Sequence, residues 1–149
     1  MSDSFVDHLP SHEQRRLKRM MSAAAYEKLR ERVKGPEDLE KEMQRNDRMA
    51  EAKFALESEP KMHETLRNQM EQDIKQQGME KVLDAKDLST DTKKALEQGK
   101  FRLTVSSHPQ THQDHLMAVP EGTVQEQIPV KVTYSEKYVA QLQQAQKKT

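Results

Sequence analysis

The residues best suited to chemistry gather between positions 108 and 115. Three of the six histidines and one aspartate fall there, in the order His108, His112, Asp114 and His115. Imidazole and carboxylate groups are good ligands for zinc, nickel or copper. Two histidines four residues apart can chelate an ion from one turn of a helix. However, Pro109 lies between His108 and His112, in a polar run that is typical of a loop.

We therefore expect these histidines to be solvated in a polar loop, or to cap its turns, rather than to hold a metal ion. The sequence predicts no bound metal and no cofactor. If a metal does bind, the ligands to test first are His112, Asp114 and His115.

A second candidate site is the basic stretch near the N-terminus. Between Glu13 and Lys34 there are eight basic residues and three acidic ones, and the next stretch is acidic. Such a stretch can neutralise nucleic-acid phosphates, or it can lie against the acidic second helix. The balance of 25 basic and 25 acidic residues, with only three tyrosines and three phenylalanines to stack on bases, favours the second interpretation. In the nucleic-acid alternative, the contacts are Arg15, Arg16, Lys18, Arg19, Arg30 and Arg32.

Signatures of catalysis are otherwise missing from the sequence. The four glycines are too far apart to form a phosphate-binding loop or a dinucleotide fingerprint. There is no G-x-S-x-G nucleophile turn and no H-E-x-x-H zinc motif. With no cysteine, thiolate metal sites and cysteine nucleophiles are excluded as well. We therefore expect a protein that is not an enzyme.

The composition indicates helices around a thin core. Hydrophobic residues make up 33% of the 149 residues and charged residues 34%, so apolar material is scarce. Because the net charge is zero, helices with many ion pairs are a better expectation than a disordered coil. No apolar run approaches the roughly 20 residues needed to span a bilayer, and no secretion signal is visible, so we expect a cytoplasmic protein with no membrane contact.

Local signals predict a mainly α protein with about three amphipathic helices, a small β-containing or extended segment, and a short terminal helix. The expected parts are a flexible N-terminus over 1–10, a helical region over 11–98, and a C-terminal segment over 99–149 with a frayed tail. Ser11 with Gln14 predicts a capping box at the first helix, with a possible break at Met21 to Ser22. Pro36 and Pro60 each begin a further helix, the second of which ends at Gly78.

After residue 99 the apolar period changes from helical to two. Phe101, Leu103 and Val105 alternate with polar residues, as expected for a strand. Two more strands are predicted, over 116–119 and 128–132, with Pro129 arguing for an edge position. A short helix is expected from Ser135.

These features favour an interaction or assembly module of the adaptor, scaffold or regulator type, which uses amphipathic helices and possibly strand addition. Its partner is a protein or a second copy, because thin amphipathic helices satisfy their apolar stripes by pairing; nucleic acid is the alternative. The methionines among the helices suit core filling or adaptable contacts. The predicted partner contacts are Leu39, Met43, Phe54, Leu66, Met70 and Ile74 on the helices, with Val130, Val132 and Tyr134 as a docking strand.

Overall fold

The computed structural model describes residues 4–84, 86–122 and 126–147, and it confirms a mainly helical chain with a small sheet. The chain divides into two compact units, each described by itself below. The first comprises Met1–Asp47 with Ser107–Asp114, and the second Arg48–Ser106 with His115–Thr149. The division therefore differs from the boundary at residue 98 that the change of period suggested, because the strands pack on helices of the second unit.

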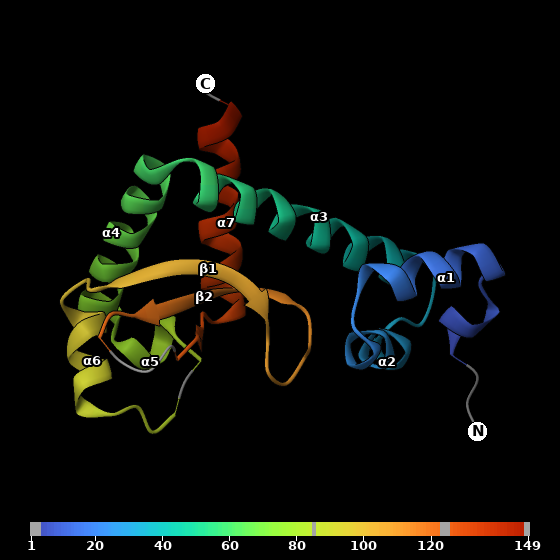
Figure 1. Cartoon of the computed structure of the whole chain (residues 1–149), viewed down its shortest axis with the longest axis horizontal. Coiled ribbons are helices and arrows are strands. Elements are labelled where there is room, and N and C mark those ends of the chain that lie inside the picture. The colour runs from blue at the N-terminus through green and yellow to red at the C-terminus, as the bar shows by residue number, and fades with distance from the viewer. Residues whose placement is uncertain (1–3, 85, 123–125, 148–149) are drawn as a thin grey trace. The chain divides into compact units, whose positions relative to one another are not determined.

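The first unit is a cluster of short helices (Figure 1). It contains η1 (Phe5–His8), α1 (Ser11–Met20), α2 (Ala23–Arg32) and the first half of α3 (Pro36–Ser58). The predicted break between α1 and α2 is confirmed, and the Ser22 hydroxyl accepts a hydrogen bond from the Ala25 amide of 3.1 Å. The buried core of the unit is Val6, Leu17, Tyr26, Leu29 and Val33.

Within the segment expected to be flexible, residues 1–3 lie outside the described residues, and residues 5–8 form a 3-10 helix with Val6 fully buried in the core of this unit. The expected capping box was wrong, since Pro10 is the N-cap of α1 and has no side-chain bond. Instead, the Gln14 amide reaches back and donates to the carbonyls of Asp7 and Leu9, at 3.0 and 2.7 Å.

The second unit begins in α3 and contains the remaining helices. They are α4 (Pro60–Gln77), α5 (Met79–Val82), α6 (Thr90–Glu97) and α7 (Val132–Lys147). The predicted start of α4 at Pro60 and its predicted end at Gly78 are confirmed. Gly78, with φ of +93°, ends α4 and donates its amide to the Ile74 carbonyl. Ser89 caps α6 through the Thr92 amide at 3.2 Å.

The three strands of the second unit form an antiparallel sheet in the order β1-β2-β3. The strands are β1 (Phe101–Ser107), β2 (Asp114–Pro120) and β3 (Ile128–Pro129). In β3, Pro129 pairs with Met117 and Ile128 with Ala118, so the expected edge position of the proline is confirmed. Alternate residues of β1 are buried, and α7 crosses behind the sheet in Figure 1.

The expected docking strand does not form. Val130 is fully buried and makes an isolated bridge to Leu83, whereas Val132 and Tyr134 lie in α7. The helix also begins three residues before the predicted start at Ser135. The reason is helical spacing, because residues three and four positions apart share one face of a helix. The buried residues of α7 with this spacing are Ser135, Tyr138, Val139 and Leu142.

The buried face of α3 also differs from the predicted one. Met49, Ala52, Ala55 and Leu56 face the core of the second unit, whereas Phe54 is 68% exposed. Alanines on the inner face allow close approach of neighbouring elements. The prediction selected large apolar residues and therefore did not identify this alanine-containing face. No helix in the described part of the chain is both long and apolar enough to cross a membrane.

Candidate interaction site

The outer edge of β1 faces the corner of α3 and α4. β1 is an outer strand, and the Glu121 amide donates to the Lys100 carbonyl at 2.9 Å. Because backbone groups alternate between the two edges of an antiparallel strand, residues 102, 104 and 106 face β2. The amides and carbonyls of Phe101, Leu103 and Val105 therefore point away from the sheet.

One outward amide of β1 is already occupied. The Leu103 amide donates to His63 Nε2 on α4 at 2.8 Å, which also confirms the direction in which this residue points. Among the described residues, no hydrogen bond from outside the sheet reaches the backbone of Val105. The edge is thus partnered at Leu103, and Val105 is buried at the wall of the groove described next.

A groove of about 320 Å³ runs along this edge, between β1 and the corner where α3 ends and α4 begins. We call it the edge groove. Its lining is Lys53, Leu56, Glu57, Pro60, His63, Arg102, Leu103, Thr104 and Val105. It combines apolar walls, two cations and one anion, so it offers apolar and charged contacts to a ligand.

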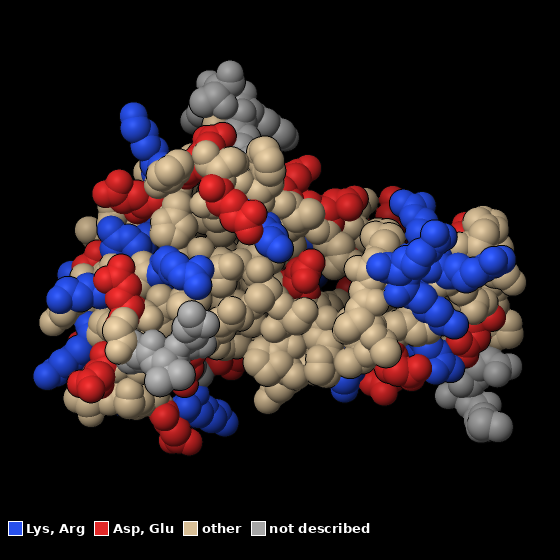
Figure 2. Space-filling model, viewed as in Figure 1, with Lys and Arg blue, Asp and Glu red and all other residues tan. Residues whose placement is uncertain are grey.

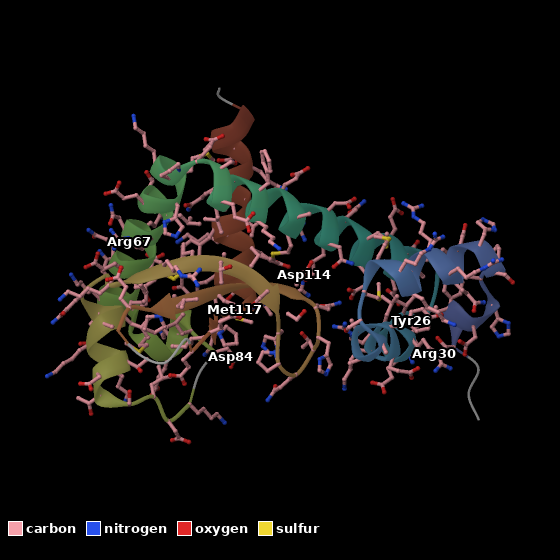
Figure 3. The ribbon with its side chains drawn as sticks, in the orientation of Figure 1. Tyr26, Arg30, Arg67, Asp84, Asp114 and Met117 are labelled. Carbon is pink, nitrogen blue, oxygen red and sulfur yellow. The ribbon has the colours of Figure 1, made fainter. Side chains whose placement is uncertain are left out.

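His63 is held in its neutral form at this edge. Burial lowers the pKa of its imidazole, and the positive charge of Arg67 lowers it further. A neutral ring keeps a lone pair on Nε2, which is what the Leu103 amide requires of its acceptor. Arg67 lies on α4 (labelled in Figure 3) and donates to the Gly99 carbonyl just before β1. α4 is therefore tied to β1 by two side chains.

Phe54 is the most exposed large apolar side chain among the described residues. It follows Lys53 directly and precedes Glu57 by three positions, and both of these residues line the edge groove. Positions three apart are neighbours on a helix surface. Phe54 therefore lies on the same two turns of α3 as the groove wall, toward solvent.

The other predicted partner contacts take different places. Leu66, Met70 and Ile74 are buried in the core of the second unit, and Leu39 and Met43 pack on the core of the first. Val132 is half exposed at the start of α7, and Tyr134 is half-buried beside Lys137. Leu66 also lines a smaller pocket between α4 and α7, and Phe54 is the exposed member of the set on the turns that wall the edge groove.

The basic residues of α1 form a separate surface on the first unit. Figure 2 shows Lys and Arg side chains gathered over this helix. Arg15, Arg16 and Arg19 are exposed, and among the described residues none of the three has an ion pair within 4.0 Å. The expected neutralisation of this helix by the acidic stretch that follows is therefore not seen for these three arginines.

The remaining basic residues of the alternative are engaged within the unit. Arg30, labelled with Tyr26 in Figure 3, pairs with Asp7 at 2.6 Å and with Glu27 at 3.0 Å. Lys18 lies 5.4 Å from the centroid of the Tyr26 ring. Arg32 is half-buried, and its Nε donates to the Lys28 carbonyl at 3.4 Å.

The histidine-rich segment does not assemble a metal site in the described residues, where no three metal-ligating side chains come together. His108 is buried, and its Nδ1 accepts from the amides of Gln110 and Thr111 at 3.1 and 3.3 Å. This is the turn-capping role expected as one alternative. His115 is buried in β2 with Nε2 against the Val130 carbonyl, and so is not solvated.

The edge groove had no local signal in the sequence. It joins the corner of α3 and α4 to a strand about 40 positions later, and only tertiary packing brings the two together. No protein-family model, curated protein or solved structure matches the chain.

Proposed function

We propose that this chain is a cytoplasmic, non-catalytic interaction module that contacts a protein partner through Phe54 and the edge groove. The observation that carries the proposal is the 68% exposure of Phe54 on the α3 turns that wall the groove. The absence of cysteine is consistent with a reducing compartment.

Energetics support a protein partner for this surface. Single exposed apolar residues are common and need no explanation. Here the phenylalanine lies on the helix turns that wall a concave surface with apolar residues at Leu56 and Pro60. Burying one phenylalanine contributes about 1.5–3 kcal/mol, and aromatic anchors beside pockets commonly dominate protein interfaces.

Site-specific photo-cross-linking tests this proposal. A photoreactive phenylalanine analogue is placed at Phe54 in the full chain, and a matched variant carries it at Gln76, an exposed position on α4. After irradiation in cell extract treated with nuclease, we expect a discrete protein adduct from position 54 and none from position 76. Identical adduct patterns from the two positions, or none from position 54, would contradict the proposal.

A second candidate function is nucleic-acid binding through α1. It is favoured by the exposed Arg15, Arg16 and Arg19, which have no ion-pair partner among the described residues. Such cations gain affinity by releasing counterions from phosphates. The acidic residues of the whole chain, equal in number to the basic ones, weaken this candidate against the first.

Salt titration tests the second candidate. Binding to labelled duplex DNA and single-stranded RNA is measured across a range of salt concentrations for the wild type and for Arg15→Gln/Arg16→Gln/Arg19→Gln. If α1 binds phosphates, the slope of log affinity against log salt decreases by roughly 0.7–0.9 for each arginine–phosphate pair that the substitutions remove. The matched control is Lys28→Gln/Lys75→Gln, which removes lysines already paired with Glu31 and Glu71. Equal slopes for all three proteins would exclude this candidate.

A further inference from the structure

We infer that the edge groove binds a carboxylate group of the partner protein through Lys53 and Arg102. A neighbouring apolar side chain of the same partner segment packs on Leu56 and Pro60. This inference rests on the proposed function and specifies the chemistry of the partner. All four residues belong to the second unit, so the site lies within one compact part of the chain.

The two cations of the groove have no counter-ion in the described part of the chain. Lys53 and Arg102 are exposed, and neither makes an ion pair within 4.0 Å with another described residue. Glu57, four residues after Lys53 on α3, is the one anion among the described lining residues. A lysine that precedes its glutamate by four positions is the weaker orientation for a helical pair. Arg102 on β1 is left uncompensated, and the lining carries one net positive charge.

The imidazole of His63 responds to this positive charge. It lines the groove from α4, and its Nε2 accepts from the Leu103 amide at 2.8 Å. Burial lowers the pKa of His63, and the charges of Arg67 on α4 and Arg102 on β1 lower it further. A carboxylate in the groove opposes these two cations. Binding should therefore raise the pKa of His63, which reports directly on an anion beside the ring.

The size and charge of the groove favour a carboxylate over a phosphate. Its volume of about 320 Å³ is close to the lower limit of about 300 Å³ for pockets that bind ligands, so it suits a few side chains. A phosphate group on a side chain carries a charge of about −1.5 to −2, and Glu57 repels it more strongly than it repels one carboxylate. The fitting segment therefore has an acidic residue beside an apolar one.

Peptide selection on the full chain tests the inference. The probe is a phage-displayed library of random seven-residue peptides. Each selected peptide is also made in an amide form, with its Asp and Glu changed to Asn and Gln, and in a form with phosphoserine at the acidic position. All forms are titrated against the wild type, Lys53→Gln/Arg102→Gln and Glu57→Gln. The matched control is Lys81→Gln/Lys93→Gln, which removes two exposed lysines of the same unit that have no ion pair among the described residues.

We expect the selected peptides to carry an acidic residue next to an apolar one. Their affinity should fall at least about threefold with Lys53→Gln/Arg102→Gln and stay unchanged in the control. Glu57→Gln should strengthen binding, because it removes the repelling charge, and the amide form should not depend on the two cations. In the wild type, NMR titration of the His63 ring should show a higher pKa with the acidic peptide bound and no increase with the amide form.

The inference is overturned if no acidic peptide is selected, if Lys53→Gln/Arg102→Gln binds as tightly as the control, or if the pKa of His63 does not rise. Two further results would also overturn it. Tighter binding of the phosphoserine form would assign the groove to a phosphorylated segment. A dimer that Lys53→Gln/Arg102→Gln dissociates, as measured by light scattering, would assign the carboxylate to a second copy of the chain.

The two proposals fail separately. If the adduct at position 54 persists in Lys53→Gln/Arg102→Gln and no acidic peptide is selected, the protein still contacts a partner, but not through a carboxylate in the groove. If acidic peptides raise the pKa of His63 and no adduct forms at position 54, the groove binds carboxylates, and the role of Phe54 is refuted.

Discussion

The phenol of Tyr138 donates a hydrogen bond of 2.7 Å to Asp73 Oδ2, and this bond joins α7 to α4. The tyrosine is fully buried, and Lys137 adds a second, longer contact to the same carboxylate oxygen at 3.4 Å. Burial raises the pKa of Tyr138, and Asp73 raises it further, so the phenol remains a donor at neutral pH. The terminal helix is thus fixed by a polar contact as well as by its apolar face.

Replacing Tyr138 with phenylalanine should lower the free energy of unfolding by about 1–3 kcal/mol, because Asp73 loses its donor while the ring still packs. Urea denaturation followed by circular dichroism measures the change. The control is Tyr134→Phe, since Tyr134 is half-buried and contacts the Tyr138 ring at 5.9 Å between centroids. We expect about 0.5 kcal/mol or less for the control. Equal losses in the two variants would show that the Asp73 bond contributes little.

A side chain at Gly99 should be poorly tolerated. This residue has φ of +73°, and a Cβ there would collide with the Glu71 carboxylate and Arg67 Nη1 on α4. Gly99→Ala is therefore expected to cost about 2 kcal/mol or more, from backbone strain and displacement of those side chains together. In a Glu71→Ala background the nearest atoms are gone, so the same substitution should cost less. Additive losses in this double-mutant cycle would refute the collision.

The pair of Asp7 and Arg30 should stabilise the first unit only when Asp7 is ionised. The hydrogen bond from Arg30 lowers the pKa of Asp7 below its ordinary value of 3.8. A carboxyl group whose pKa is lower in the folded chain than in the unfolded chain stabilises the fold at pH values above its unfolded pKa. That stabilisation is lost as the pH falls through the folded pKa. Asp7→Asn should therefore speed amide exchange at Val6 and Leu9 at neutral pH. The difference from wild type should vanish at about pH 2, and a difference that persists there would exclude an ionic cause.

His63 should make stability depend on pH near neutrality. Because burial lowers its pKa below the ordinary value of 6.5, the folded chain resists protonation more than the unfolded chain does. Stability is therefore complete above about pH 6.5 and decreases as pH falls below it. In His63→Gln, an amide oxygen can accept from Leu103 without titrating. We expect the wild type to lose more stability than this variant between about pH 7.5 and pH 5 by urea denaturation, and parallel losses would contradict the assignment.

Sequence reasoning located most of the helices because their ends carry strong local signals. Pro36 and Pro60 suit a first helical turn, Gly78 accepts a left-handed conformation, and Ser22 caps a helix within the first 35 residues. The alternation at Phe101 to Val105 located β1 for the same reason. In each case the decisive physical preference lies within a few residues of the feature.

The errors arose where tertiary packing decides. Val132 begins a helix although its neighbours alternate like a strand, and the buried Tyr138 and Val139 anchor that helix in the core. The inner face of α3 depends on which elements approach Ala52 and Ala55. The edge groove depends on the contact between His63 and Leu103, 40 positions apart, and no local pattern encodes that pairing.

The hydrogen bond between the Leu103 amide and His63 also bears on how this protein should be handled in acid. Strand edges without partners are templates for aggregation, and many proteins cover them with a helix or a loop. Here the imidazole of His63 on α4 covers part of the β1 edge, and it loses its acceptor when it takes up a proton. We expect the wild type to aggregate more readily than His63→Gln as the pH is lowered, as measured by light scattering.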